Sequence, residues 1–240
     1  MTEEKSDQEV TNGEVNTASY SAVQCDNERD LRVPCYCEEN VWRLAYRRLN
    51  NATADLQREE YFVAFVSNEQ KCCPFLFQRA SSDPEKPCWW DYHVILIERS
   101  KIAGEESKVW DLDSHLSYPS PLQSYLSETF FRIKFADDES AQRYAPLFRV
   151  VHAEIFLKTF YSDRKHMFDG NKWLSPPPQY ECIMPNDTNR LALNQKGEIS
   201  NLDDYVKMKP PVVGYDTDHR TILCPFGEIL TAQDLLLKFS

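Results

Sequence analysis

Two cysteines one residue apart stand where a helix is expected to begin. Cys35 and Cys37 follow Pro34, and apolar residues then recur at spacings of three and four, which predicts a helix over residues 37–50. A thiol at the start of a helix lies near free backbone N–H groups and the positive end of the helix dipole, and both lower its pKa. The same N–H groups can bind the oxyanion of an attacked carbonyl. This pattern indicates a candidate nucleophile, although two ordinary, partly buried cysteines before a helix would show it too.

Two glutamates directly after the second cysteine work against a thiolate. Glu38 and Glu39 fall in the first turn of the predicted helix, where carboxylates suit the dipole but disfavour a further negative charge at Cys37. A nucleophile at this position therefore needs a base or a cation from another part of the chain.

Two predicted strands supply a base and a group to orient it. Residues 89–97 are aromatic and β-branched and end in an apolar run, which predicts a central strand, and residues 108–113 predict the strand that returns beside it. If the connection is centred on residue 102, His93 faces Asp111 closely enough for a hydrogen bond. A register shift of one residue would destroy that pairing. A cysteine, a histidine and an aspartate in these roles form a nucleophilic triad.

Each member of this set also has a simpler explanation. A single histidine on an apolar strand is more often a hydrogen-bonded core residue, and an aspartate often ends a strand. Metal binding is a rival use of the cysteines, but Cys35 and Cys37, like Cys72 and Cys73, lack the usual Cys-x-x-Cys spacing. We therefore expect no metal site, and six glycines in the whole chain leave no room for a Gly-rich phosphate loop.

Composition limits the remaining classes of function. The 240 residues are 42% hydrophobic and carry a net charge of −11, and this acidic balance argues against nucleic-acid and anionic-membrane partners. The sequence contains no apolar run long enough to span a membrane and no apolar signal-peptide core. The eight cysteines are therefore expected to be reduced thiols, in the cytoplasm or nucleus.

The domain organisation follows from a change in composition near residue 33. Residues 1–32 are acidic and poor in apolar residues, which predicts a disordered tail. Residues 33–240 are expected to form a single catalytic domain. Besides the elements above, the patterns predict a hairpin of strands over 61–68 and 72–78, a helix over 122–133, a strand over 148–153, and a last helix over 232–239 with Thr231 as its N-cap.

Seven sequence blocks, taken together and in order, resemble the protein N-terminal glutamine amidohydrolase family. They are CYCEENVW at 35–42, FVSNE at 65–69, WDYHV at 90–94, DLD at 111–113, FRV at 148–150, SDRxHM at 162–167 and PPP at 176–178. The resemblance runs from about residue 33 to residue 206. It does not cover the acidic tail, and it is poor after residue 213, where residues 216–226 look like an insertion.

The resemblance implies an α+β fold similar to papain-like and transglutaminase-like cysteine hydrolases, with an antiparallel sheet packed with helices. It implies that the side chain of an N-terminal glutamine is deamidated to glutamate with release of ammonia, which feeds the arginylation branch of the N-degron pathway. The family's catalytic residues fall on Cys37, His93 and Asp111, and no metal or cofactor is required. The expected partners are proteins and peptides with N-terminal glutamine, and a monomer is expected.

Selecting the first residue of a chain requires an acceptor for its α-ammonium group. Glu39 and Asp204 are acidic candidates, and the residues that bind substrate stay unknown at this stage. Two other functions use the same sequence features. One is a cysteine peptidase or transglutaminase-type acyl transferase with the same triad, and the other is an inactive module that recognises N-terminal residues.

Overall fold

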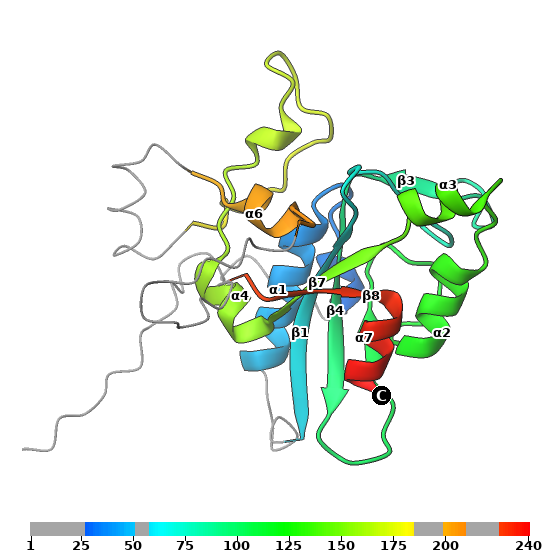
Figure 1. Ribbon diagram of the computed structural model, residues 1–240. Coiled ribbons are helices and arrows are strands. Elements are labelled where there is room, and N and C mark those ends of the chain that lie inside the picture. Colours follow the sequence, from blue (N-terminus) through cyan, green and yellow to red (C-terminus); the bar gives the residue numbers. More distant parts are fainter. Residues whose placement is uncertain (1–26, 51–57, 185–198, 210–225) are drawn as a thin grey trace, which may run out of the picture.

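The chain folds around a six-stranded antiparallel sheet with helices on both faces (Figure 1). The strand order is β6-β5-β4-β1-β7-β8, and a separate two-stranded sheet pairs β2 with β3. This computed structural model describes residues 27–50, 58–184, 199–209 and 226–240. The α+β class and the antiparallel sheet packed with helices are thus confirmed.

The elements have the following bounds. The strands are β1 (Glu59–Ser67), β2 (Cys73–Phe75), β3 (Cys88–Trp90), β4 (His93–Ser100), β5 (Lys108–Trp110), β6 (Ser120–Pro121), β7 (Leu147–His152) and β8 (Glu228–Thr231). The α-helices are α1 (Cys37–Asn50), α2 (Leu122–Leu126), α3 (Asp138–Arg143), α4 (Ala153–Thr159), α6 (Leu202–Val206) and α7 (Ala232–Phe239). The shorter helical turns are η2 (Glu28–Leu31), the π-helical η4 (Ser127–Phe131) and η5 (Lys165–Met167).

The two central strands, β1 and β4, are buried on both faces because alternate side chains enter two different cores. Val63 and Val94 face the core beneath α1, α4 and α6, whereas Ala64 and Ile95 face the core beneath α2, η4 and α7. Figure 1 shows these two helix groups on opposite sides of the sheet. In the first core α1 packs against β4, and this packing places the start of α1 near the start of β4.

Most predicted elements are confirmed. The helix over 37–50 is α1, the strand over 61–68 is β1, the strand over 148–153 is β7, and the last helix is α7. Thr231 caps α7 in a capping box, in which its hydroxyl accepts the Asp234 N–H and the Asp234 carboxylate accepts the Thr231 N–H. The predicted strand over 89–97 is interrupted at residues 91–92 and becomes β3 and β4, and the helix over 122–133 becomes α2 and η4.

The predicted hairpin of residues 61–68 and 72–78 is wrong, because β2 pairs with β3 instead of β1. Asn68 explains the difference. Its side-chain oxygen accepts hydrogen bonds from the N–H groups of Gln70 and Cys72, and its amide donates to the Cys72 carbonyl. With the positive φ of 48° at Lys71, this turn directs the chain away from the sheet.

The predicted tail and the predicted insertion are only partly within the described residues. Residues 1–26 and 216–225 lie outside them. The part of the chain that is described begins at Asn27, and η2 places the Leu31 side chain fully in the core under α1. None of the helices in the described ranges combines the length and the apolar character that a membrane crossing requires.

Candidate active site

The predicted contact between His93 and Asp111 is present and buried. His93 Nε2 lies 2.9 Å from Asp111 Oδ1, and both side chains are almost completely excluded from solvent. Trp90 stacks on the imidazole at a centroid distance of 6.3 Å, and the edge of Phe75 meets it at 5.5 Å. The ring is therefore held in one orientation. Nε2 is hydrogen-bonded to Asp111, and Nδ1 is the nitrogen that can exchange a proton with a reacting group.

The register by which this contact was predicted is wrong by two residues, because residue i faces residue 206 − i instead of residue 204 − i. Leu96 pairs with Trp110 and Ile97 with Val109, so the connection is centred on residue 103 instead of 102. The contact survives because Asp111 lies just beyond the end of β5, where the chain turns. Its Oδ1 atom accepts the Asp113 N–H at 2.9 Å, and this bond turns the carboxylate toward the start of β4.

The Asp111 carboxylate is ionised and well supported. Besides His93 and the Asp113 N–H, it accepts a hydrogen bond from the Tyr125 hydroxyl at 2.8 Å, and the Gln78 amide is 3.4 Å away. Burial by itself would raise its pKa, but the charge and hydrogen bond of His93, with the other donors, lower it overall. Burial would likewise lower the pKa of His93, and Asp111 reverses this, so the pKa of His93 is raised.

The candidate nucleophile is the first residue of α1. Cys37 begins the helix and is half-buried, whereas Cys35 is exposed and has a positive φ of 67°. The Val94 backbone amide hydrogen bonds the Cys37 sulfur, so the thiol lies against the residue that follows His93. Among the described residues, however, the hydrogen bond that the thiol itself donates goes to Glu38 Oε2 at 3.6 Å and not to His93.

The expectation of a lowered thiol pKa is wrong for this structure. Burial, followed by the negative charges of Glu38 and Asp113, raises the pKa of Cys37 well above its usual value, and the Val94 amide offsets this only in part. The start of the helix thus does not by itself yield a thiolate here. The acidic groups around it require a compensating positive charge, which agrees with the need inferred from Glu38 and Glu39.

The two candidates for binding a substrate ammonium group are placed differently by the structure. Glu39 is fully buried and accepts two hydrogen bonds from Arg164, at 2.7 Å from Nε and 2.8 Å from Nη2. This bidentate ion pair satisfies the Glu39 carboxylate, so Glu39 is wrong as a free acceptor. Asp204 lies on α6, exposed, with Lys207 at 3.2 Å.

Three side chains lie together near the thiol, and their meeting there was not predicted from the sequence. Glu38 is fully buried beside Cys37, the Tyr92 hydroxyl donates to its Oε2 atom at 3.1 Å, and His166 Nε2 lies 3.5 Å from its Oε1 atom. All three residues fall within blocks 35–42, 90–94 and 162–167. Their shared membership of these blocks was the available indication that they meet in space.

A metal ion is a poor fit to the donor atoms gathered here. Atoms of His93, Asp111 and Asp113 lie within 4.8 Å of one another, which is close enough for shared coordination. Arg32 Nε, however, lies 2.6 Å from Asp113 Oδ1 and already supplies a positive charge to that carboxylate. Because His93 Nε2 is also engaged by Asp111, the arrangement suits an ion-paired hydrogen-bond network better than a cation site.

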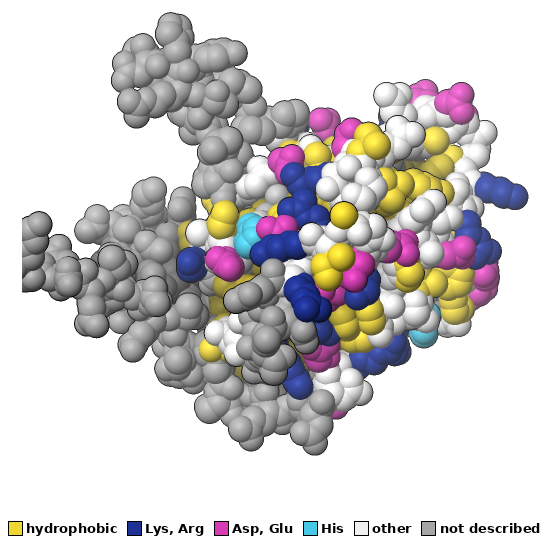
Figure 2. Space-filling model, turned by 90° about the horizontal axis from the view of Figure 1, so that it is seen from below, with side chains coloured by type: hydrophobic (Ala, Val, Ile, Leu, Met, Phe, Trp, Pro, Cys, Tyr) yellow, Lys and Arg dark blue, Asp and Glu magenta, His cyan; other side chains and the backbone are white. Residues whose placement is uncertain are grey.

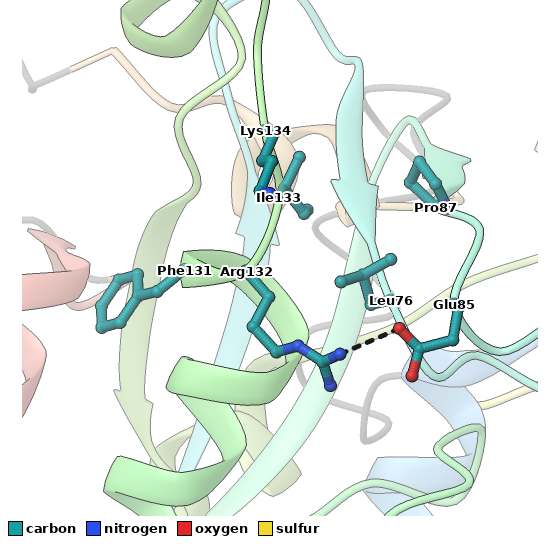
Figure 3. A pocket seen from close by; sticks show the side chains of 7 residues that line it. All are labelled: Leu76, Glu85, Pro87, Phe131, Arg132, Ile133 and Lys134. Atoms are coloured by element: carbon teal, nitrogen blue, oxygen red, sulfur yellow. Dashed lines mark hydrogen bonds and ion pairs between the residues drawn. The ribbon is translucent and has the colours of Figure 1, made fainter.

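A surface pocket of about 560 Å³ lies elsewhere, between the loop before β3 and the end of η4. Figure 3 shows its lining, in which the Arg132 guanidinium reaches across to the Glu85 carboxylate at 2.9 Å. The lining contains none of the triad candidates and no unpaired nucleophile. On the face seen in Figure 2, the coloured acidic, basic and hydrophobic side chains are intermingled, without a broad field of one charge.

The chain is similar to known proteins over most of its length. Residues 32–239 match the family model described as N-terminal glutamine amidase. A protein N-terminal glutamine amidohydrolase of Arabidopsis thaliana is 40% identical over 212 residues, which cover 87% of this chain and 89% of that relative. Relatives of the same name from Danio rerio and Homo sapiens are 33% and 36% identical, covering 95% and 74% of this chain and 98% and 78% of their own.

Proposed function

The chain belongs to the N-terminal glutamine amidase family, and from this premise we propose that it deamidates the side chain of N-terminal glutamine. The products are N-terminal glutamate and ammonia. The observation that carries the proposed mechanism is the buried 2.9 Å contact between His93 Nε2 and Asp111 Oδ1. It leaves Nδ1 of an oriented imidazole to act on the Cys37 thiol, as a Cys-His-Asp mechanism requires.

In the first half of the proposed reaction, Cys37 is acylated. The thiol turns from Glu38 toward His93 and passes its proton to Nδ1, while the sulfur attacks the side-chain amide carbon. First-turn N–H groups of α1, including that of Cys37, bind the oxyanion, and losing one such donor typically costs on the order of a hundredfold in rate. His93 then gives the proton to the departing nitrogen, which leaves as ammonia and leaves a thioester on Cys37.

In the second half, water hydrolyses the thioester. Neutral His93 takes a proton from the water as its oxygen attacks the thioester carbon, and the sulfur departs and recovers the proton from His93. The raised pKa of His93 assists both halves, because Asp111 stabilises the imidazolium that forms in each. The side chains and backbone of the protein, together with water, supply every group that these steps use.

We also propose that the fold is of the papain-like or transglutaminase-like kind. The support is the order and placement of the residues: a cysteine at the start of a helix, then a histidine at the start of a central antiparallel strand, then an aspartate after the neighbouring strand. The helix packs on the sheet beside that histidine-bearing strand. This placement presents a thiol and an imidazole from separate elements to one site.

The family resemblance also supports a cellular role for the reaction. We place it in the arginylation branch of the N-degron pathway, where an N-terminal glutamate is the group that is arginylated. The enzyme is proposed to act as a monomer in the cytoplasm and nucleus. Light scattering of the purified chain tests the oligomeric state, and microscopy of the tagged protein tests its location.

The central experiment measures ammonia released from three peptides of one sequence, with the glutamine first, acetylated at its α-amine, or preceded by one residue. Only the first peptide is expected to react. Cys37→Ala is expected to abolish release, whereas Cys35→Ala, its matched control in the same segment, stays within about twofold. Ammonia from the internal glutamine or a cut backbone favours a transferase or a peptidase, and an inactive wild-type protein favours a binding module.

A further inference from the structure

A buried carboxylate with an unfilled hydrogen-bonding position lies beside the candidate nucleophile. Glu38 is fully buried, and its Oε2 atom accepts from the Tyr92 hydroxyl at 3.1 Å and from the Cys37 thiol at 3.6 Å. Its Oε1 atom is shielded from solvent and accepts no hydrogen bond from any described residue. Buried carboxylate oxygens are nearly always paired, so an empty position of this kind points to a ligand.

No side chain in the described ranges neutralises Glu38. The nearby Arg164 is already ion-paired with the neighbouring Glu39. His166 Nε2 is 3.5 Å from Glu38 Oε1, but burial lowers the pKa of His166 below its ordinary value of 6.5, so near neutral pH it is an uncharged ring. Burial and the charge of Glu39 accordingly raise the pKa of Glu38 to about 7.

We propose that Glu38, with Tyr92 and His166, forms the site that binds the α-ammonium group of the substrate's first residue. This inference rests on the proposed deamidation and names the group that gives it its specificity for a chain's N-terminus. An alkylammonium offers three N–H donors and no acceptor. Glu38 Oε1, the Tyr92 oxygen and neutral His166 Nε2 offer three acceptors, since the Tyr92 proton is already donated to Glu38 Oε2.

The spacing of these acceptors suits a single nitrogen. His166 Nε2 lies 3.4 Å from the Tyr92 oxygen and 3.5 Å from Glu38 Oε1. Hydrogen bonds of about 2.9 Å can reach one nitrogen that stands above three atoms so placed. The side chains of Cys37, Tyr92 and His166 are each partly exposed, so solvent reaches the residues that surround the buried carboxylate.

The site also measures the length of the first side chain. Four bonds separate the α-nitrogen of glutamine from its amide carbon, a span of at most about 5 Å for bonds of ~1.5 Å. With the ammonium bound at Oε1, the amide carbon is brought to the Cys37 sulfur, which lies 3.6 Å from the other oxygen of the same carboxylate. Asparagine is one methylene shorter and places its amide carbon short of that position.

Binding of the ammonium couples substrate recognition to the reactivity of the thiol. The charge of Glu38 is one of the causes that raise the pKa of Cys37. A cation on Glu38 offsets that charge, so the thiolate becomes more accessible when the correct substrate is bound. A peptide whose α-amine is acetylated or extended brings no positive charge and leaves the thiol protonated.

The test compares two peptides that differ only in the α-amine, one beginning with glutamine and the other with its des-amino analogue, 4-carbamoylbutanoyl. The readout is the ratio of kcat/KM for ammonia release in three proteins: wild type, Glu38→Gln, and Asp204→Asn as the matched control. Wild type and Asp204→Asn are expected to prefer the amine by roughly 10- to 150-fold, the range of a hydrogen bond to a charged group. In Glu38→Gln this preference is expected to fall to about threefold or less.

Two results overturn the inference while leaving the proposed deamidation intact. One is a Glu38→Gln enzyme that keeps the wild-type preference for the amine, and the other is one that loses both activities by the same factor, as a merely structural role predicts. A second variant, Tyr92→Phe, retains the Glu38 carboxylate and tests the same site if Glu38→Gln does not fold. Its preference for the amine is expected to fall severalfold. A wild-type protein that releases no ammonia from either peptide refutes the deamidation and this inference together.

Discussion

Replacing Asp111 by asparagine separates the two tasks of the carboxylate, which are to orient the imidazole and to stabilise its charge. In the wild-type structure Oδ1 accepts hydrogen bonds from both His93 Nε2 and the Asp113 N–H. Because the backbone N–H requires an acceptor, the asparagine oxygen is expected to take the Oδ1 position. Its NH₂ group then faces Tyr125, whose hydroxyl can rotate to accept a hydrogen bond from it.

This geometry sets the size of the expected loss. With the oxygen retained at Oδ1, the histidine keeps its tautomer, and the enzyme loses only the difference between a charged and a neutral acceptor. A hydrogen bond to a charged group contributes about 1.5–3 kcal/mol, against about 1 kcal/mol for a neutral pair, so kcat is expected to fall by roughly 2- to 30-fold. An amide that turned its NH₂ toward His93 would impose the wrong tautomer, with a loss of about 10⁴.

The assay is kcat for ammonia release from a glutamine-initiated peptide, measured as a function of pH. Without the Asp111 charge, burial prevails and lowers the pKa of His93, so the acid limb of the profile moves to lower pH in Asp111→Asn. Tyr125→Phe removes a hydrogen bond but retains the charge, and it is expected to leave the acid limb near its wild-type position. A loss near 10⁴, or a limb that does not move, refutes this reasoning.

Two further predictions concern stability. Folding raises the pKa of Glu38, so the carboxyl group ionises more readily in the unfolded chain than in the folded one. The free energy of unfolding is therefore highest below pH 4.5 and falls as the pH rises from 4.5 to about 7. Urea unfolding should therefore show Glu38→Gln more stable than wild type by about 3 kcal/mol at pH 8 and nearly equal to it at pH 4; equal stability at pH 8 contradicts the raised pKa. Arg164→Ala strands the buried Glu39 carboxylate and should destabilise by about 3–5 kcal/mol, whereas removal of the exposed pair in Arg143→Ala should have little effect; similar losses in both variants contradict a buried ion pair.

Local patterns predicted the elements whose burial is simple and periodic. The helix α1 and the central strands β1 and β4 follow from apolar spacing, because each presents regular faces to the two cores. The pairing of β2 did not follow, since the Asn68 side chain bonds a turn that apolar spacing does not encode. The four-residue strand β8 was missed because its residues are not buried in an alternating pattern.

The candidate site was predicted in its residue types more than in its electrostatics. Cys37, His93 and Asp111 were chosen for the chemistry that they allow together, and the His93–Asp111 contact is present despite the shift in register. The direction of the Cys37 pKa was wrong, because burial and the charges of Glu38 and Asp113 depend on how separate elements pack. Such long-range terms have no counterpart in the spacing of residues along one segment.

Selectivity for a chain's first residue has two physical sources, which different substrates separate. A closed wall behind the α-nitrogen rejects a longer chain by collision, and it rejects an acetylated amine equally well. A wall does not reject a des-amino peptide, which is smaller than the natural substrate. A site rejects a smaller analogue strongly only when the missing group leaves a buried polar partner unsatisfied, and the Oε1 atom of Glu38 is such a partner. Discrimination against the des-amino peptide is therefore a measure of the ammonium site alone, whereas discrimination against extended peptides combines that site with the wall.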